Sequence, residues 1–87
     1  MSMLEQTGAI EAGIASIIVQ ITGWPADDIG SDFEFFHNGV LDSLGVVELV
    51  SAVEDELGVA LREEDLLDER FSTVGGLAMI VAERRQS

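Results

Sequence analysis

The amino-acid sequence predicts an all-α fold, a small antiparallel four-helix bundle with three main helices, one short helix and a long first loop. The chain has 87 residues, which is enough for a single domain with one modest hydrophobic core. Apolar residues recur every three or four positions in three separate segments. A glycine directly follows two of these segments, where helices commonly end. We therefore expect residues 1–87 to form one domain.

The first helix is expected over residues 2–22, with isoleucines gathered on one face. Ser2 and Glu5 can form a capping box at its start. Gly23 is a candidate left-handed cap at its end, and Pro25 prevents the helix from continuing. The apolar stripe consists of Ile10, Ile14, Ile17, Ile18 and Ile21.

Residues 24–41 form a long connection that is rich in glycine, aspartate and serine. Loops of this length in compact domains are functional or disordered, and the apolar content here argues against disorder. We expect an ordered loop that some of its aromatic side chains pin to the core. Its large apolar residues include Ile29, Phe33, Phe35, Phe36, Val40 and Leu41.

The second helix is expected over residues 43–57, with Gly58 as its stop. At about 100° per residue, one stripe of this helix faces inward and another faces solvent. The inward stripe holds Val46, Leu49, Val50, Val53 and Leu57. The outward side holds Leu44, Val47, Glu48 and Ser51.

The last third of the chain predicts a short helical turn around residues 63–67 and a final helix that begins near Thr73, a good N-cap. Gly75 and Gly76 lie in the first turn of that helix, where each costs about 1 kcal/mol relative to alanine. This turn is therefore either loose or closely packed, and the sequence leaves both readings open.

The charge balance is strongly acidic, with 17 Asp and Glu residues against four arginines and a formal net charge of -13. Nucleic acid demands a basic face, so it is nearly excluded as a partner, and anionic membrane surfaces are disfavoured for the same reason. We expect protein partners that carry basic patches, although acidity also keeps a small domain soluble.

Cysteine is absent, so the chain has no disulfides or thiolate metal sites, and the spacing of its acids does not fit a calcium loop. We see no signal peptide at the start and no apolar stretch long enough to cross a bilayer. We expect a cytoplasmic monomer without a metal ion. The acidic runs at residues 54–56 and 63–65 are expected to be solvated faces.

Residues 39–44 read Gly-Val-Leu-Asp-Ser-Leu and lead directly into the second predicted helix. This stretch resembles the attachment motif of acyl carrier proteins, in which an Asp-Ser-Leu triplet opens the second helix. The resemblance implies that the hydroxyl of Ser43 is joined through a phosphodiester to 4′-phosphopantetheine, with Asp42 and Leu44 as neighbouring cofactor-binding residues. The similarity continues through residues 47–50, 54–59 and 71–74.

The position of Ser43 supports this resemblance independently. A serine at a helix start has its hydroxyl beside unpaired backbone N–H groups, which suit a phosphodiester anion. An isolated serine there would be read as an N-cap, but the surrounding motif favours attachment. Asp42 can cap the helix, and the family's motif implies that its carboxylate can also help an incoming transferase to organise metal and cofactor. The arm supplies the thiol, and chemistry takes place in partner enzymes, so we expect a carrier that is itself no enzyme.

Two residues, Val40 and Leu41, separate Gly39 from the triplet, where fatty-acid carriers have one. Gly45 stands where those carriers commonly have an acidic residue. Together with residues 67–73, these features are more similar to D-alanyl carriers and to the freestanding carriers of specialised pathways. We expect a carrier of a small acyl or aminoacyl unit in polyketide, nonribosomal-peptide, antibiotic or related biosynthesis. A D-alanyl-type carrier for cell-envelope modification is the alternative.

The resemblance implies three kinds of partner: a phosphopantetheinyl transferase, an adenylating or acyl-transferring loading enzyme, and downstream condensing, transfer or tailoring enzymes. We expect Val46 to line the entrance of any acyl-sheltering cavity. An unmodified acidic interaction domain is a different class of function for this chain. A small enzyme is disfavoured because His37 completes no Ser–His–acid arrangement. The expected partner-binding residues are Leu44, Val47, Glu48 and Ser51.

Overall fold

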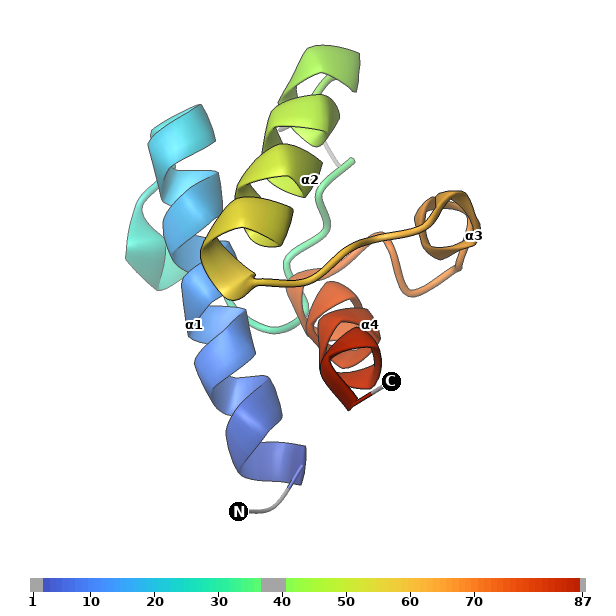
Figure 1. Cartoon of the computed structure of the whole chain (residues 1–87). Coiled ribbons are helices and arrows are strands. Elements are labelled where there is room, and N and C mark those ends of the chain that lie inside the picture. The colour runs from blue at the N-terminus through green and yellow to red at the C-terminus, as the bar shows by residue number, and fades with distance from the viewer. Residues whose placement is uncertain (1–2, 37–40, 87) are drawn as a thin grey trace.

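The computed structural model describes residues 3–36 and 41–86. Within these ranges the chain is helical and contains no strand, which confirms the predicted all-α fold and small helical bundle. In Figure 1, α1 and α2 lie side by side and run in opposite directions, and α4 packs across α1. The elements in chain order are α1 (Met3–Thr22), η1 (Ala26–Asp28), α2 (Ser43–Leu57), α3 (Glu63–Leu66) and α4 (Val74–Gln86).

The helix ends agree with the sequence prediction to within one residue. Gly23 and Gly58 adopt positive φ values of 76° and 67°, as expected for glycines that end helices in the left-handed conformation. The capping box predicted at the start of α1 needs Ser2, which lies outside the described residues. The 3-10 turn η1 was not predicted, because a single three-residue turn has too few positions to show a periodicity.

The core forms mainly where α1 meets α4, and α2 covers it from one side. Four isoleucines of the predicted stripe are fully buried, and Ile21 packs at the margin. The long loop adds Ile29, Phe35 and Leu41, so the prediction of a loop pinned by an aromatic side chain is confirmed. The buried apolar residues of α2 and α4 are Leu49, Val53, Val74, Leu77, Ala78, Ile80, Val81 and Ala82.

Backbone hydrogen bonds also tie the long loop to the start of α4. The N–H of Phe35 donates to the carbonyl of Ser72 at 2.8 Å, and the N–H of Val74 donates to the carbonyl of Phe33 at 3.1 Å. These bonds form an isolated antiparallel bridge. The loop thereby satisfies a backbone donor of α4 that has no partner inside its own helix.

The first turn of α4 is closely packed, which decides between the two readings that the sequence left open. Thr73 caps the helix, because its Oγ1 accepts from the N–H of Gly76 at 3.0 Å. The N–H of Gly75 donates to the carbonyl of Ser31 at 2.7 Å. A side chain on Gly76 would overlap the carbonyl oxygen of Arg70. Glycine is required at this position by the close approach of two backbone segments.

Candidate functional site

Ser43 is the first residue of α2, and its side chain is exposed. The preceding residue, Asp42, is the N-cap: it has extended backbone angles, and its Oδ1 accepts from the N–H of Gly45 at 2.8 Å. The capping role is therefore filled, and the reading of Ser43 as the N-cap is wrong. Within residues 3–36 and 41–86, no hydrogen bond engages the Ser43 hydroxyl.

The first turn of α2 presents two backbone donors near that hydroxyl. The N–H of Val46 donates to the carbonyl of Asp42 at 2.9 Å, which closes the first turn of the helix. The N–H groups of Ser43 and Leu44 have no acceptor among the described residues. Free N–H groups at the positive end of a helix dipole suit an anion. An exposed hydroxyl beside them fits a phosphodiester linkage.

Gly45 is explained by packing rather than by conformation. It is buried, and a β-carbon there would lie 3.0 Å from Cδ2 of Leu41 and 3.3 Å from Oδ1 of Asp42. Leu41 is itself buried, and its N–H donates to the carbonyl of Phe35 at 3.1 Å. The absence of a side chain at Gly45 thus lets Leu41 fill the space beneath the first turn of α2. Leu41 in turn anchors the chain just before the helix. Gly39, Val40 and His37 lie outside the described residues.

The exposed and buried faces of α2 match the helical wheel. Leu44 and Val47 are 66% and 61% exposed, and Glu48 and Ser51 are exposed beside them. On the opposite side Val46 is half-buried and packs against the core. A shallow surface hollow continues the outward face toward the end of the helix, and its lining residues are Glu48, Ser51, Ala52, Glu54, Asp55 and Glu56.

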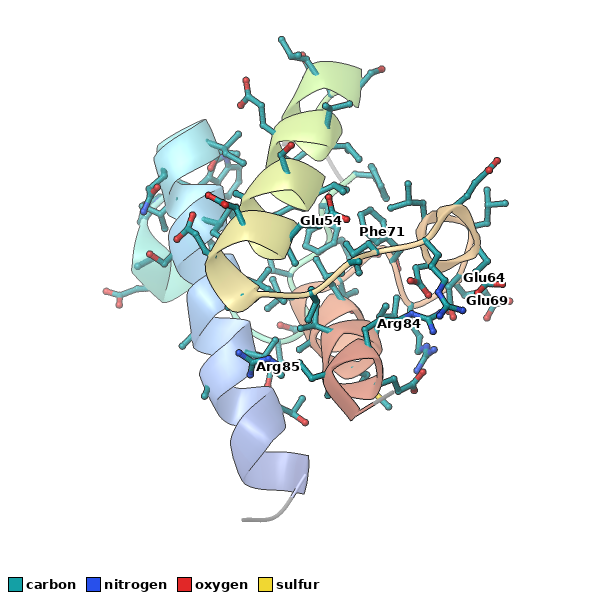
Figure 2. All side chains as sticks on the ribbon, viewed as in Figure 1. Glu54, Glu64, Glu69, Phe71, Arg84 and Arg85 are labelled. Carbon is teal, nitrogen blue, oxygen red and sulfur yellow. The ribbon has the colours of Figure 1, made fainter. Side chains whose placement is uncertain are left out.

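The expectation that both acidic runs are solvated is wrong at two positions. Glu54 is half-buried, and its Oε2 accepts from the N–H of Leu61 at 2.9 Å. This bond links the connection that follows α2 back to the helix (Figure 2). Asp65 is buried and ion-paired with Arg84. Sequence reasoning missed both, because their partners are seven and 19 positions away and no local pattern marks them.

Comparison with known proteins identifies the family. Residues 12–80 match the family model described as a phosphopantetheine attachment site. The chain belongs to this family. Its cofactor, 4′-phosphopantetheine, is carried covalently, as expected from the sequence, and its members are carriers rather than enzymes.

Curated relatives agree with this assignment. The chain is 38% identical over 72 residues to the meromycolate extension acyl carrier proteins of Mycobacterium leprae and Mycobacterium tuberculosis (strain H37Rv), which is 83% of this chain and 61% of each relative. It is 35% identical to the protein of the same name from Mycolicibacterium aurum, over 83% of this chain and 72% of that relative. The match thus spans less than two thirds of the two mycobacterial relatives.

Within residues 3–36 and 41–86, no helix is long and apolar enough to cross a membrane. The same part of the chain contains no group of three or more histidine, cysteine or acidic side chains placed to hold a metal ion.

Proposed function

We propose that the protein carries an acyl group as a thioester on a 4′-phosphopantetheine arm attached to the Oγ of Ser43, and presents it to partner enzymes. The observation that carries this proposal is the exposed hydroxyl of Ser43 in the first turn of α2, which makes no hydrogen bond to any described residue and leaves the capping role to Asp42. When bound, the arm supplies the terminal thiol that this cysteine-free chain lacks. Asp42 holds the helix start, and the N–H groups of Ser43 and Leu44 would be the donors available to the phosphodiester anion.

The names of the curated relatives favour an acyl cargo over an aminoacyl one, because they describe acyl carrier proteins of meromycolate extension. We therefore place this chain with acyl carriers of a specialised pathway, ahead of the D-alanyl alternative. The expected partners are a phosphopantetheinyl transferase, an acyl-transferring loading enzyme and downstream condensing or tailoring enzymes.

Intact mass spectrometry tests the attachment directly. The purified chain is incubated with coenzyme A and a broad-specificity phosphopantetheinyl transferase, and fragment masses then locate the addition. We expect one phosphopantetheine per chain, on Ser43. A chain that gains no mass, beside a known carrier that is fully converted, would instead be an unmodified acidic interaction domain.

We place the partner-binding surface on the outward face of α2, defined by Leu44, Val47, Glu48 and Ser51. Two large apolar side chains are more than half exposed within two turns of Ser43, where the fold does not need them. Scattered surface apolar residues are normal, but a partner that receives the arm has to touch this area. Apolar contact lengthens the lifetime of the complex, while the negative charge of Glu48 steers the approach of a partner that carries a basic patch.

Substitutions on this face are expected to slow transfer without unfolding the chain. Val47→Asp should lower the rate of loading by roughly tenfold, as expected for a central contact of an interface. Glu48→Lys should lower the association rate about threefold at low ionic strength, with an effect that shrinks as salt screens the charge. Steady-state and stopped-flow assays with the loading enzyme measure both.

The chain offers matched controls for these substitutions. Met79 is an exposed apolar residue on α4, and Glu69 is an exposed acid outside α2. Met79→Asp and Glu69→Lys repeat the same chemical changes elsewhere and should leave both rates unchanged. If a control variant slowed the reaction as much as its counterpart on α2, the proposal that α2 forms the partner-binding surface would be wrong.

Val46 is proposed to line the entrance of a space that shelters the acyl chain. Its side chain is half-buried against the core one turn after Ser43, and Val50 occupies the equivalent position one turn further along. We expect Val46→Phe to change the chemical shifts or the thioester lifetime of the acylated protein more than the shifts of the unmodified protein. Val50→Phe should affect both forms equally. An equal effect of Val46→Phe on both forms would make Val46 ordinary core.

A further inference from the structure

The helix α3 contributes almost nothing to the hydrophobic core. The two leucines at its end, Leu66 and Leu67, are 40% and 80% exposed. The buried residue of α3 is Asp65, which is 4% exposed and is the one buried charged side chain among the described residues. In Figure 1, α3 stands to one side of the three long helices, and an ion pair between Asp65 and Arg84 joins it to α4. Apolar burial, which holds the three long helices together, therefore does not hold this segment.

Asp65 is held by a two-pronged ion pair from α4. Nε of Arg84 donates to Oδ2 of Asp65 at 2.8 Å, and Nη2 donates to Oδ1 at 2.6 Å. Oδ2 also accepts from the backbone N–H of Arg62 at 2.9 Å, so both carboxylate oxygens are used. Figure 2 shows Arg84 reaching from α4 toward α3, with Glu64 close by. The Arg84 hydrogen bonds hold the pKa of the Asp65 carboxyl below its usual range, and they raise the pKa of Arg84.

A second arginine holds the turn that follows α3. Nη1 of Arg70 donates to Oε2 of Glu83 on α4 at 2.5 Å, and its Nη2 donates to Oδ2 of Asp68 at 2.9 Å. These hydrogen bonds lower the pKa of both carboxyl groups. The apolar anchors lie only at the ends of the segment, at the partly buried Leu61 and the buried Phe71.

We propose that residues 62–69 form an ionic latch, a segment that lifts from α4 as a unit while α1, α2 and α4 stay packed and the backbone of Arg70 stays against Gly76. Arg84 contributes most to holding this segment on α4, because its partner Asp65 is buried. Removing one member of a buried ion pair leaves the other charge unpaired. Arg70 contributes less to holding the segment, because its ion pairs are more exposed to solvent and exposed ion pairs add little stability. The latch is a property of the unmodified chain and does not depend on the proposed carrier function.

Amide hydrogen exchange measured by NMR on the unmodified protein tests the latch. The N–H groups of Asp65 and Asp68 report on it, because they donate to carbonyls inside the segment at 2.9 and 3.2 Å. Ile17 and Ile18, buried in the middle of α1, report on unfolding of the whole domain. In the wild-type protein we expect protection at Asp65 and Asp68 to be at least about tenfold lower than at Ile17 and Ile18, since a local opening costs less than global unfolding.

Arg84→Gln should lower the protection of the Asp65 amide by a further tenfold or so, while the chemical shifts of α1 stay helical. Arg85→Gln is the matched control: it removes the same charge one position along, from an exposed side chain, and should change protection less than about twofold. Leu67→Gln should also have little effect, because the latch does not depend on this exposed leucine.

Three results would overturn the latch. One is equal protection at Asp65 and Ile17 in the wild-type protein, which would mean that the segment opens only when the domain unfolds. Another is an Arg84→Gln variant whose Asp65 protection matches that of Arg85→Gln. The third is an Arg84→Gln variant that does not fold, because residues 62–69 would then belong to the same cooperative unit as the bundle.

Discussion

Replacing Ser43 with alanine is expected to abolish phosphopantetheine attachment completely while leaving the fold intact. The hydroxyl is the proposed nucleophile for the transferase, and it makes no hydrogen bond within the described residues. The N-cap bond belongs to Asp42, and alanine is a good helix former, so the free energy of unfolding should change by less than about 0.5 kcal/mol. Intact mass after incubation with coenzyme A and transferase measures the first effect, and thermal melting followed by circular dichroism measures the second.

The control for this substitution is Ser16→Ala, which changes an exposed serine of α1 outside the proposed partner surface. That variant should take up one phosphopantetheine at the wild-type rate. If Ser43→Ala still gained the mass of one arm, the assignment of the attachment site would be wrong, even though membership of the family would stand.

Gly76→Ala is expected to destabilise the fold by a net of about 1–2 kcal/mol, because forcing extra volume into a closely packed contact costs about 2–3 kcal/mol and alanine regains about 1 kcal/mol in helix propensity. A β-carbon on Gly76 would overlap the backbone carbonyl of Arg70, which is not the movable end of a side chain. The start of α4 and the turn after α3 would have to separate, although Thr73 and the long loop hold the same helix start by hydrogen bonds.

Urea unfolding followed by circular dichroism measures the effect, with Gly8→Ala as the matched control. Gly8 is exposed in α1, and a β-carbon there meets nothing within 4 Å. The same substitution should therefore raise stability at Gly8 by up to about 1 kcal/mol. A Gly76→Ala variant as stable as the wild-type protein would contradict this prediction, because it would show that the turn at Arg70 can move aside without lowering the free energy of unfolding.

The sequence predicted the long helices and singled out Ser43 as a candidate attachment site because these signals are local. Apolar spacing over a few turns marks α1, α2 and α4, and glycines at positions 23 and 58 mark two of their ends. The motif around Ser43 is contiguous, so it could be recognised without knowing the fold. The helical wheel also gave the correct exposure of Leu44 and Val47.

The contacts that only the tertiary structure decided join residues far apart in the sequence. The burial of Asp65 depends on Arg84, and the role of Glu54 depends on a backbone N–H beyond the end of its helix. The need for glycine at position 76 depends on the carbonyl of Arg70. A carboxylate in an acidic run has the same sequence pattern whether it faces water or an arginine, and a glycine has the same pattern whether its surroundings are empty or full. Local periodicity therefore determined the helices, and a contiguous motif singled out Ser43 as the proposed attachment site, whereas long-range packing decided which charges are buried and which glycines are indispensable.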